Sequence, residues 1–103
     1  MNRADFIANE INDLSFEDLP EELVERTKDL ILDQLGCQLA FSGLEWGQAV
    51  HNYVLMHNTQ GNSTITRYGE KMGAEDAAIC NSVFAHGFEM DDTETLTGTH
   101  PGS

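Results

Sequence analysis

The hydrophobic positions of this chain recur mainly at helical spacing. Asn2 is a good helix-capping residue, and it precedes four apolar residues spaced for one face of a helix, namely Phe6, Ile7, Ile11 and Leu14. We predict a first helix from Asn2 to about Leu14. Residues 15–19 then form a link, because Pro20 and the acidic residues after it suit the first turn of a second helix.

The second predicted helix begins at Pro20 and ends before Gly43, a plausible terminator. Its mostly apolar face comprises Leu23, Thr27, Leu30, Ile31, Gln34, Leu35 and Leu39. A third helix is predicted over residues 45–57, with a stripe formed by Trp46, Ala49, Val50, Tyr53 and Met56. Residues 58–62 supply turn chemistry after it.

Residues 63–68, reading STITRY, alternate and are rich in β-branched side chains, which predicts one short strand. A fourth helix is predicted from the cap at Gly73 to about Phe88, with small residues that allow close packing. The predicted fold class is therefore mainly α. We expect about four helices in antiparallel or orthogonal packing, with at most one short strand, as part of a larger all-helical domain.

Candidate chemistry gathers in residues 86–103, reading HGFEMDDTETLTGTHPGS. Neighbouring carboxylates raise one another's pKa, and clusters of this kind serve proton transfer or metal binding. If the fourth helix reaches Phe88, then His86 and Glu89 share one helix face and Thr93 follows four positions later. The Thr-Gly-Thr loop would then return His100 to the same pocket.

Three segments match one family pattern in the same order: LPEELVERTKDLILDQLGCQLA at 19–40, EDAAICNSVFAHGFEMDDTE at 75–94 and HPG at 100–102. On these motifs the chain resembles the MmgE/PrpD family. Members of that family are several times longer and have a large all-helical domain and a second, lid domain. The resemblance implies that residues 1–103 are the N-terminal part of the helical domain, without the lid.

The resemblance also implies a lyase or isomerase that needs no metal or organic cofactor. Such enzymes dehydrate, decarboxylate or epimerise a small di- or tricarboxylic acid, such as a 2-methylcitrate- or aconitate-like substrate. Carried over by motif position, the catalytic residues would be Glu89, Thr93 and His100. His86, Asp91 and Asp92 would bind substrate or orient these groups.

Side-chain chemistry suggests a role for each of these residues. His100 can exchange a proton near neutral pH, Thr93 can hydrogen-bond a substrate carboxylate, and Glu89 can act as acid or base. Glu89 stands where the family usually has Asp. Only Arg67 and Lys71 offer a cation between the third helix and the motif, so we expect this chain alone neither to bind nor to turn over substrate.

Composition excludes some partners. Eighteen acidic residues against five Lys and Arg give a net charge of −13, which repels nucleic acid and anionic membranes. Cys37 and Cys80 form no C-x-x-C pair and are expected to be reduced, packed thiols. The polar N-terminus lacks a secretion signal, so we expect a cytoplasmic enzyme. The resemblance adds a homodimer as an expectation for a full-length protein.

Two other classes of function stay open at this point. The carboxylates and histidines after residue 85 are competent ligands for Mg²⁺, Mn²⁺ or Zn²⁺, which would suit a metal-binding or metal-dependent hydrolase module. A catalytically dead helical interaction domain is the third possibility. An open reading frame beyond Ser103 would favour the lyase, tight stoichiometric metal binding the second class, and a stop codon the third.

Overall fold

The computed structural model describes residues 2–103, and these form a mainly α-helical fold. The elements in chain order are α1 (Arg3–Asp13), the 3-10 helix η1 (Phe16–Asp18), α2 (Glu21–Phe41), α3 (Glu45–His57), β1 (Ser63–Thr64), β2 (Lys71–Met72) and α4 (Ala74–His86). The predicted fold class is confirmed. The bounds of the first three helices lie within a residue or two of those expected from the sequence.

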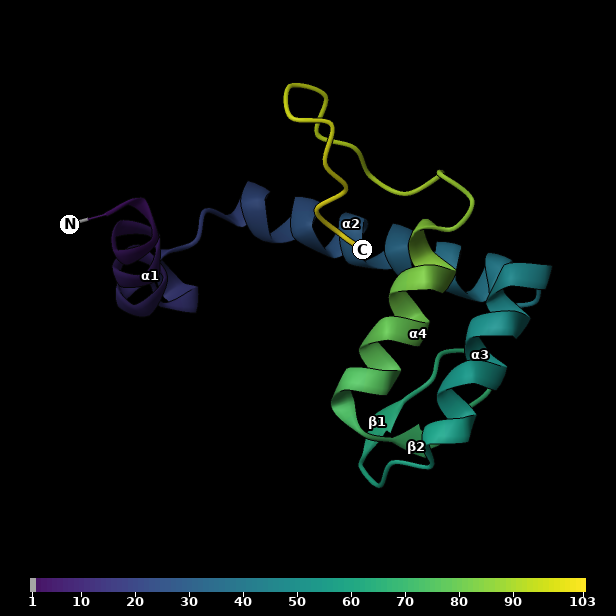
Figure 1. The fold of residues 1–103 in the computed structure, drawn as a ribbon. Coiled ribbons are helices and arrows are strands. Elements are labelled where there is room, and N and C mark those ends of the chain that lie inside the picture. The colour runs from purple at the N-terminus through teal and green to yellow at the C-terminus, as the bar shows by residue number, and fades with distance from the viewer. Residues whose placement is uncertain (1) are drawn as a thin grey trace.

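Helices α2 and α3 both pack against α4, and α2 meets it near the end of α4 (Figure 1). α3 leads away from the end of α2 to the β1–β2 hairpin, and α4 returns antiparallel to α3 until it meets α2. The chain after α4, drawn in yellow, then passes back over α2. α1 lies apart from the other helices and has no buried residue. This arrangement places the residues after 86 against α2.

The expected strand at 63–68 needs correction. Only Ser63 and Thr64 are extended, and they pair antiparallel with a second strand, in which Met72 faces Ser63 and Lys71 faces Thr64. The residues between them turn through left-handed conformations at Arg67 and Gly69, with φ of 72° and 82°. The prediction of at most one strand was therefore wrong, because the partner lies just beyond a tight turn.

The core lies between α3, α4 and the hairpin. Its buried residues are Val54, Ile65, Met72, Ala77, Cys80 and Phe84. The predicted stripe on α3 was partly wrong: Val50 packs against the core, but Met56 is 74% exposed and Gly47, His51 and Val54 are buried instead. A side chain at Gly47 would lie 2.5 Å from the carbonyl oxygen of Ser42. Glycine at this position therefore permits the close approach of α3 to the chain before it.

The apolar face of α2 is largely open to solvent. Its large side chains are 45–71% exposed at Leu23, Ile31, Leu32, Leu35 and Leu39. The residues of this helix that are buried are Gln34 and Cys37. Burial also raises the pKa of the Cys37 thiol, and that of Cys80 to about 11, so both free cysteines are protonated at neutral pH. Among the described residues no helix is long and apolar enough to cross a bilayer.

Candidate active site

The site begins with an aromatic anchor at the end of α4. The ring of Phe88 stacks on Phe41 of α2 at a centroid distance of 4.5 Å and on Trp46 of α3 at 6.2 Å. Gly87 precedes it, and any side chain there would collide with the indole of Trp46. The predicted helix end at Phe88 was two residues too late, because α4 ends at His86 and Phe88 belongs to the turn.

Glu89 reaches His86 through this turn and not along a shared helix face. Its backbone is left-handed, with φ of 57°, and its N–H donates to the carbonyl oxygen of His86 at 2.8 Å. A non-glycine residue in this region carries strain, which the anchored turn must hold. The prediction that His86 and Glu89 lie close together was correct, but the predicted cause was wrong, because a turn and not a helix joins them.

A closed loop returns the chain to the site. The N–H of Glu94 donates to the carbonyl oxygen of Thr99 at 2.8 Å, and Gly98 takes a left-handed conformation with φ of 66°. Inside the loop the Glu94 carboxylate accepts hydrogen bonds from the hydroxyl and N–H of Thr97 and from the N–H of Leu96. These bonds hold the pKa of Glu94 below its usual value. His100 follows directly.

The segment after His100 is hydrogen-bonded to Asp92 and lies close to α2. Asp92 Oδ1 accepts a hydrogen bond from the N–H of Gly102 at 3.1 Å. A side chain at Gly102 would also lie 2.7 Å from Nε2 of Gln34. A cavity of about 370 Å³ lies between this segment and α2, and the buried Gln34 amide beside it has no hydrogen-bond partner. The glycine of the HPG motif therefore permits close contact with α2.

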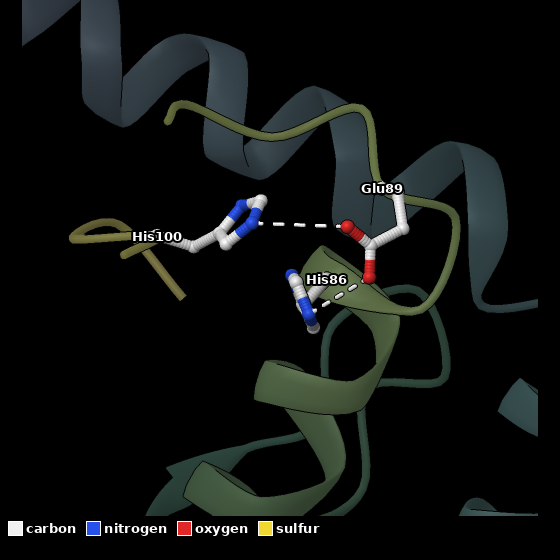
Figure 2. A group of neighbouring side chains, drawn as sticks. All are labelled: His86, Glu89 and His100. Atoms are coloured by element: carbon white, nitrogen blue, oxygen red, sulfur yellow. Dashed lines mark ion pairs between the residues drawn. The ribbon is translucent and has the colours of Figure 1, made fainter. Parts of the chain in front are cut away.

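Two histidines face one another across a glutamate (Figure 2). The Nε2 atom of His86 lies 3.2 Å from Oε1 of Glu89, and Nε2 of His100 lies 3.7 Å from Oε2. The two imidazole rings pack edge to face with centroids 4.3 Å apart. Glu89 is 70% exposed, whereas His100 is 20% exposed. Glu89 is thus the most exposed member of the group, and His86, at 41%, is more exposed than His100.

Asp91 lies beneath the same two rings. Its side chain is completely buried, and Oδ1 lies 3.2 Å from Nδ1 of both His86 and His100. The His86 contact is a hydrogen bond, whereas Nδ1 of His100 is out of alignment and has no hydrogen-bond partner. Burial would raise the pKa of Asp91, but the His86 hydrogen bond and the charges of both histidines outweigh it and lower that pKa.

Each imidazole therefore stands between two carboxylates. An ionised carboxylate only accepts hydrogen bonds, so Nδ1 of His86 carries the proton shared with Asp91. An unprotonated Nε2 would then direct its lone pair at the negative charge of Glu89, 3.2 Å away. A proton on Nε2, a proton on Glu89 or a bound cation would each turn this repulsion into attraction.

The structure gathers four of the six residues singled out from the sequence, His86, Glu89, Asp91 and His100. Thr93 is exposed on the loop outside this group, and Asp92 contacts the chain end instead. Sequence reasoning missed the closing role of Glu94 and the anchoring role of Phe88. The Glu-x-x-Thr spacing of Glu94 and Thr97 could have indicated a turn closed by side-chain hydrogen bonds. The stacking of Phe88 on Phe41 and Trp46 joins residues far apart in the sequence, so residue spacing could not have indicated it.

Comparison with known proteins covers nearly the whole chain. The model of the MmgE/PrpD N-terminal domain matches residues 5–103. A cis-aconitate decarboxylase-like protein of Aspergillus oryzae is 27% identical over 94% of this chain and 20% of its own length. The cis-aconitate decarboxylases of Aspergillus terreus and Mus musculus are 29% and 30% identical over 89% and 91% of this chain.

The chain spans about a fifth of the length of these relatives, 19% in both decarboxylases. No solved structure matches it. The family match begins in α1 and extends through the cluster to the last residue, so the fold and the candidate site both lie within it. This protein belongs to the MmgE/PrpD family, and its residues 5–103 match the N-terminal domain of that family.

Proposed function

We propose that this chain carries the proton-transfer part of a lyase or isomerase that acts on a small polycarboxylic acid. The cluster of His86, Glu89, Asp91 and His100 is the observation that carries the proposal. Its support is the pairing of two titratable rings with one buried and one exposed carboxylate. The relatives named as cis-aconitate decarboxylases make an aconitate-like substrate the first candidate.

The chemistry follows from the loss of a carboxyl group. When the C–C bond breaks, its electron pair stays on carbon, CO₂ leaves, and the carbon must receive a proton. A protonated Nε2 of His100 or His86 can donate that proton, and the ionised Asp91 stabilises the ring charge beforehand. The exposed Glu89 can then relay a proton from water to the ring. In dehydration and epimerisation the same ring nitrogen would act as a base and remove a proton from carbon.

Substrate binding is expected to need further residues. Arg67 lies against Gly43, and Lys71 donates to Thr64 in the hairpin, so neither cation reaches the cluster. A polycarboxylate normally requires such charges. We therefore infer that residues 1–103 alone neither bind nor turn over substrate. A hydrogen bond from Thr93 to a substrate carboxylate, a homodimer and a cytoplasmic location are further expectations for the complete enzyme.

The test uses the polypeptide translated from the complete reading frame that contains these residues. Purified protein is incubated with cis-aconitate or 2-methylcitrate, and product formation is followed by proton NMR. We expect turnover of one of these acids. Glu89→Gln and His100→Gln should each lower kcat by about 100-fold or more, the usual contribution of a general acid or base.

The matched control is Glu75→Gln, which removes an exposed carboxylate from the first turn of α4, away from the cluster. It should turn over at the unaltered rate. Equal rates for Glu89→Gln, His100→Gln and the unaltered enzyme would contradict the proposal, and so would the absence of turnover with either acid.

A further inference from the structure

We infer that His86, Glu89 and His100 form a binding site for one divalent first-row transition-metal ion, with Zn²⁺ as the probe. One ring nitrogen of each histidine and one carboxylate oxygen lie within 4.8 Å of one another. Two imidazoles and a carboxylate are competent ligands for zinc, and together they leave a fourth position open.

The distances suit a single small ion. Ligand atoms bound about 2.0 Å from one tetrahedral zinc ion lie about 3.3 Å from each other. The two contacts between Nε2 atoms and the Glu89 carboxylate are 3.2 and 3.7 Å. The side chain of Glu89 is 70% exposed, so its carboxylate has room to close the remaining gap.

Asp91 supplies the support that a metal-bound histidine requires. A histidine that ligates a metal through one nitrogen usually donates the N–H of the other to a carboxylate, which fixes the ring. Nδ1 of His86 donates to the buried Asp91, and Nδ1 of His100 lies 3.2 Å from the same Oδ1 without the alignment of a hydrogen bond. One buried carboxylate therefore fixes the ring of His86 and lies close enough to accept from His100 after a small rotation of that ring.

Charge leads to the same conclusion. The carboxylates of Glu89 and Asp91 surround the two imidazoles with negative charge, which attracts a divalent cation to the space between the two Nε2 atoms and Glu89. Metal binding and proton transfer use the same nitrogen lone pairs, so Zn²⁺ should inhibit the proposed lyase. The metal site itself does not depend on that function.

The experiment measures Zn²⁺ affinity of the 103-residue chain by competition with a chromophoric chelator. We expect one Zn²⁺ per chain. Glu89→Gln should weaken binding at least tenfold, and its side chain is exposed, so the fold should not suffer. Asp91→Asn should weaken binding about 10- to 100-fold through the lost ring support. His57→Gln, which removes an imidazole outside the cluster, should bind as the unaltered chain does.

Co²⁺ provides a second readout that does not depend on folding of the variants. Binding at this site should give the visible d–d bands of a four-coordinate ion without the thiolate charge-transfer band that Cys37 or Cys80 would produce. The inference is overturned if Glu89→Gln and Asp91→Asn bind Zn²⁺ as tightly as the unaltered chain, or if Co²⁺ shows thiolate ligation. Absence of lyase activity in the metal-free complete enzyme, together with intact Zn²⁺ binding, would contradict only the proposed function.

Discussion

Asp91 is the residue of the candidate site that contacts both His86 and His100. It is buried without a Lys or Arg partner, yet its oxygen lies 3.2 Å from a ring nitrogen of each histidine. Leaving a carboxylate charged in such a place is costly unless opposite charge or hydrogen bonds compensate it. The two imidazoles provide that compensation, and they are oriented in return.

A second buried carboxylate shows the same physics away from the site. Asp76, in the first turn of α4, accepts hydrogen bonds from the hydroxyl of Thr59 and from Nδ1 of His57, each at 2.6 Å. The Thr59 and His57 hydrogen bonds lower the pKa of Asp76 below 3.8. The network joins the end of α3 to the start of α4, and it was not anticipated from the sequence.

Stability should therefore depend on Asp76 in acid. A carboxyl whose pKa is lower in the folded state than in the unfolded state stabilises the fold above its unfolded pKa, and this stabilisation is lost as pH falls through the folded pKa. We expect the free energy of unfolding to fall less steeply in Asp76→Asn than in the unaltered chain as pH drops below about 4. Urea denaturation at a series of pH values measures this. Equal slopes would contradict the assignment.

At the scale of elements, the loop from Glu94 to Thr99 decides where His100 lies. Its ends are joined by the Glu94–Thr99 backbone bond, and the Glu94 carboxylate fills its interior. The loop carries no large buried side chain, so these hydrogen bonds are its main constraint.

Replacing Glu94 should loosen this loop without unfolding the helices. In Glu94→Ala we expect faster hydrogen exchange at the amides of Leu96 and Thr97, because both lose their acceptor. Exchange within α4 should stay unchanged, and Glu75→Ala serves as the control for loss of an exposed carboxylate. Protection at Leu96 and Thr97 that survives the substitution would show that the carboxylate does not hold the loop.

Helical periodicity predicted the positions of the helices well, but it could not predict close backbone contacts or left-handed backbone conformations. The buried residues of α3 include Gly47, whose close contact with the chain before it periodicity does not encode. The left-handed backbone of Glu89 is equally unreadable, because a non-glycine residue seldom adopts it. The sequence therefore predicted that His86, Glu89, Asp91 and His100 lie close together, but not the burial of Asp91 or the position of Thr93 outside this group.

At the scale of the whole molecule, the most conspicuous feature is the uncovered apolar surface of α1 and α2. Phe6, Ile7 and Ile11 on α1 are 52–65% exposed, and the large side chains along α2 are similarly open. Large exposed apolar surfaces mark sites of association. In relatives about five times longer, further chain is available to cover an equivalent surface.

We therefore expect the 103-residue chain to self-associate. Size-exclusion chromatography with light scattering should show a mass that rises with concentration, and Ile31→Gln with Leu35→Gln should reduce this rise by removing apolar area. Exchanging the exposed Glu25 for Gln leaves that area intact and is the control. A monomer at every concentration would contradict the prediction.

The central claim is that Asp91 joins His86 and His100 into one proton-transfer group. The most direct test records the imidazole ring signals of all four histidines by long-range nitrogen–proton NMR in the unaltered chain and in Asp91→Asn. We predict that His86 and His100 shift together while His51 and His57 stay in place, and that Nδ1 of His86 carries a proton. Unchanged signals for His86 and His100 would contradict the claim.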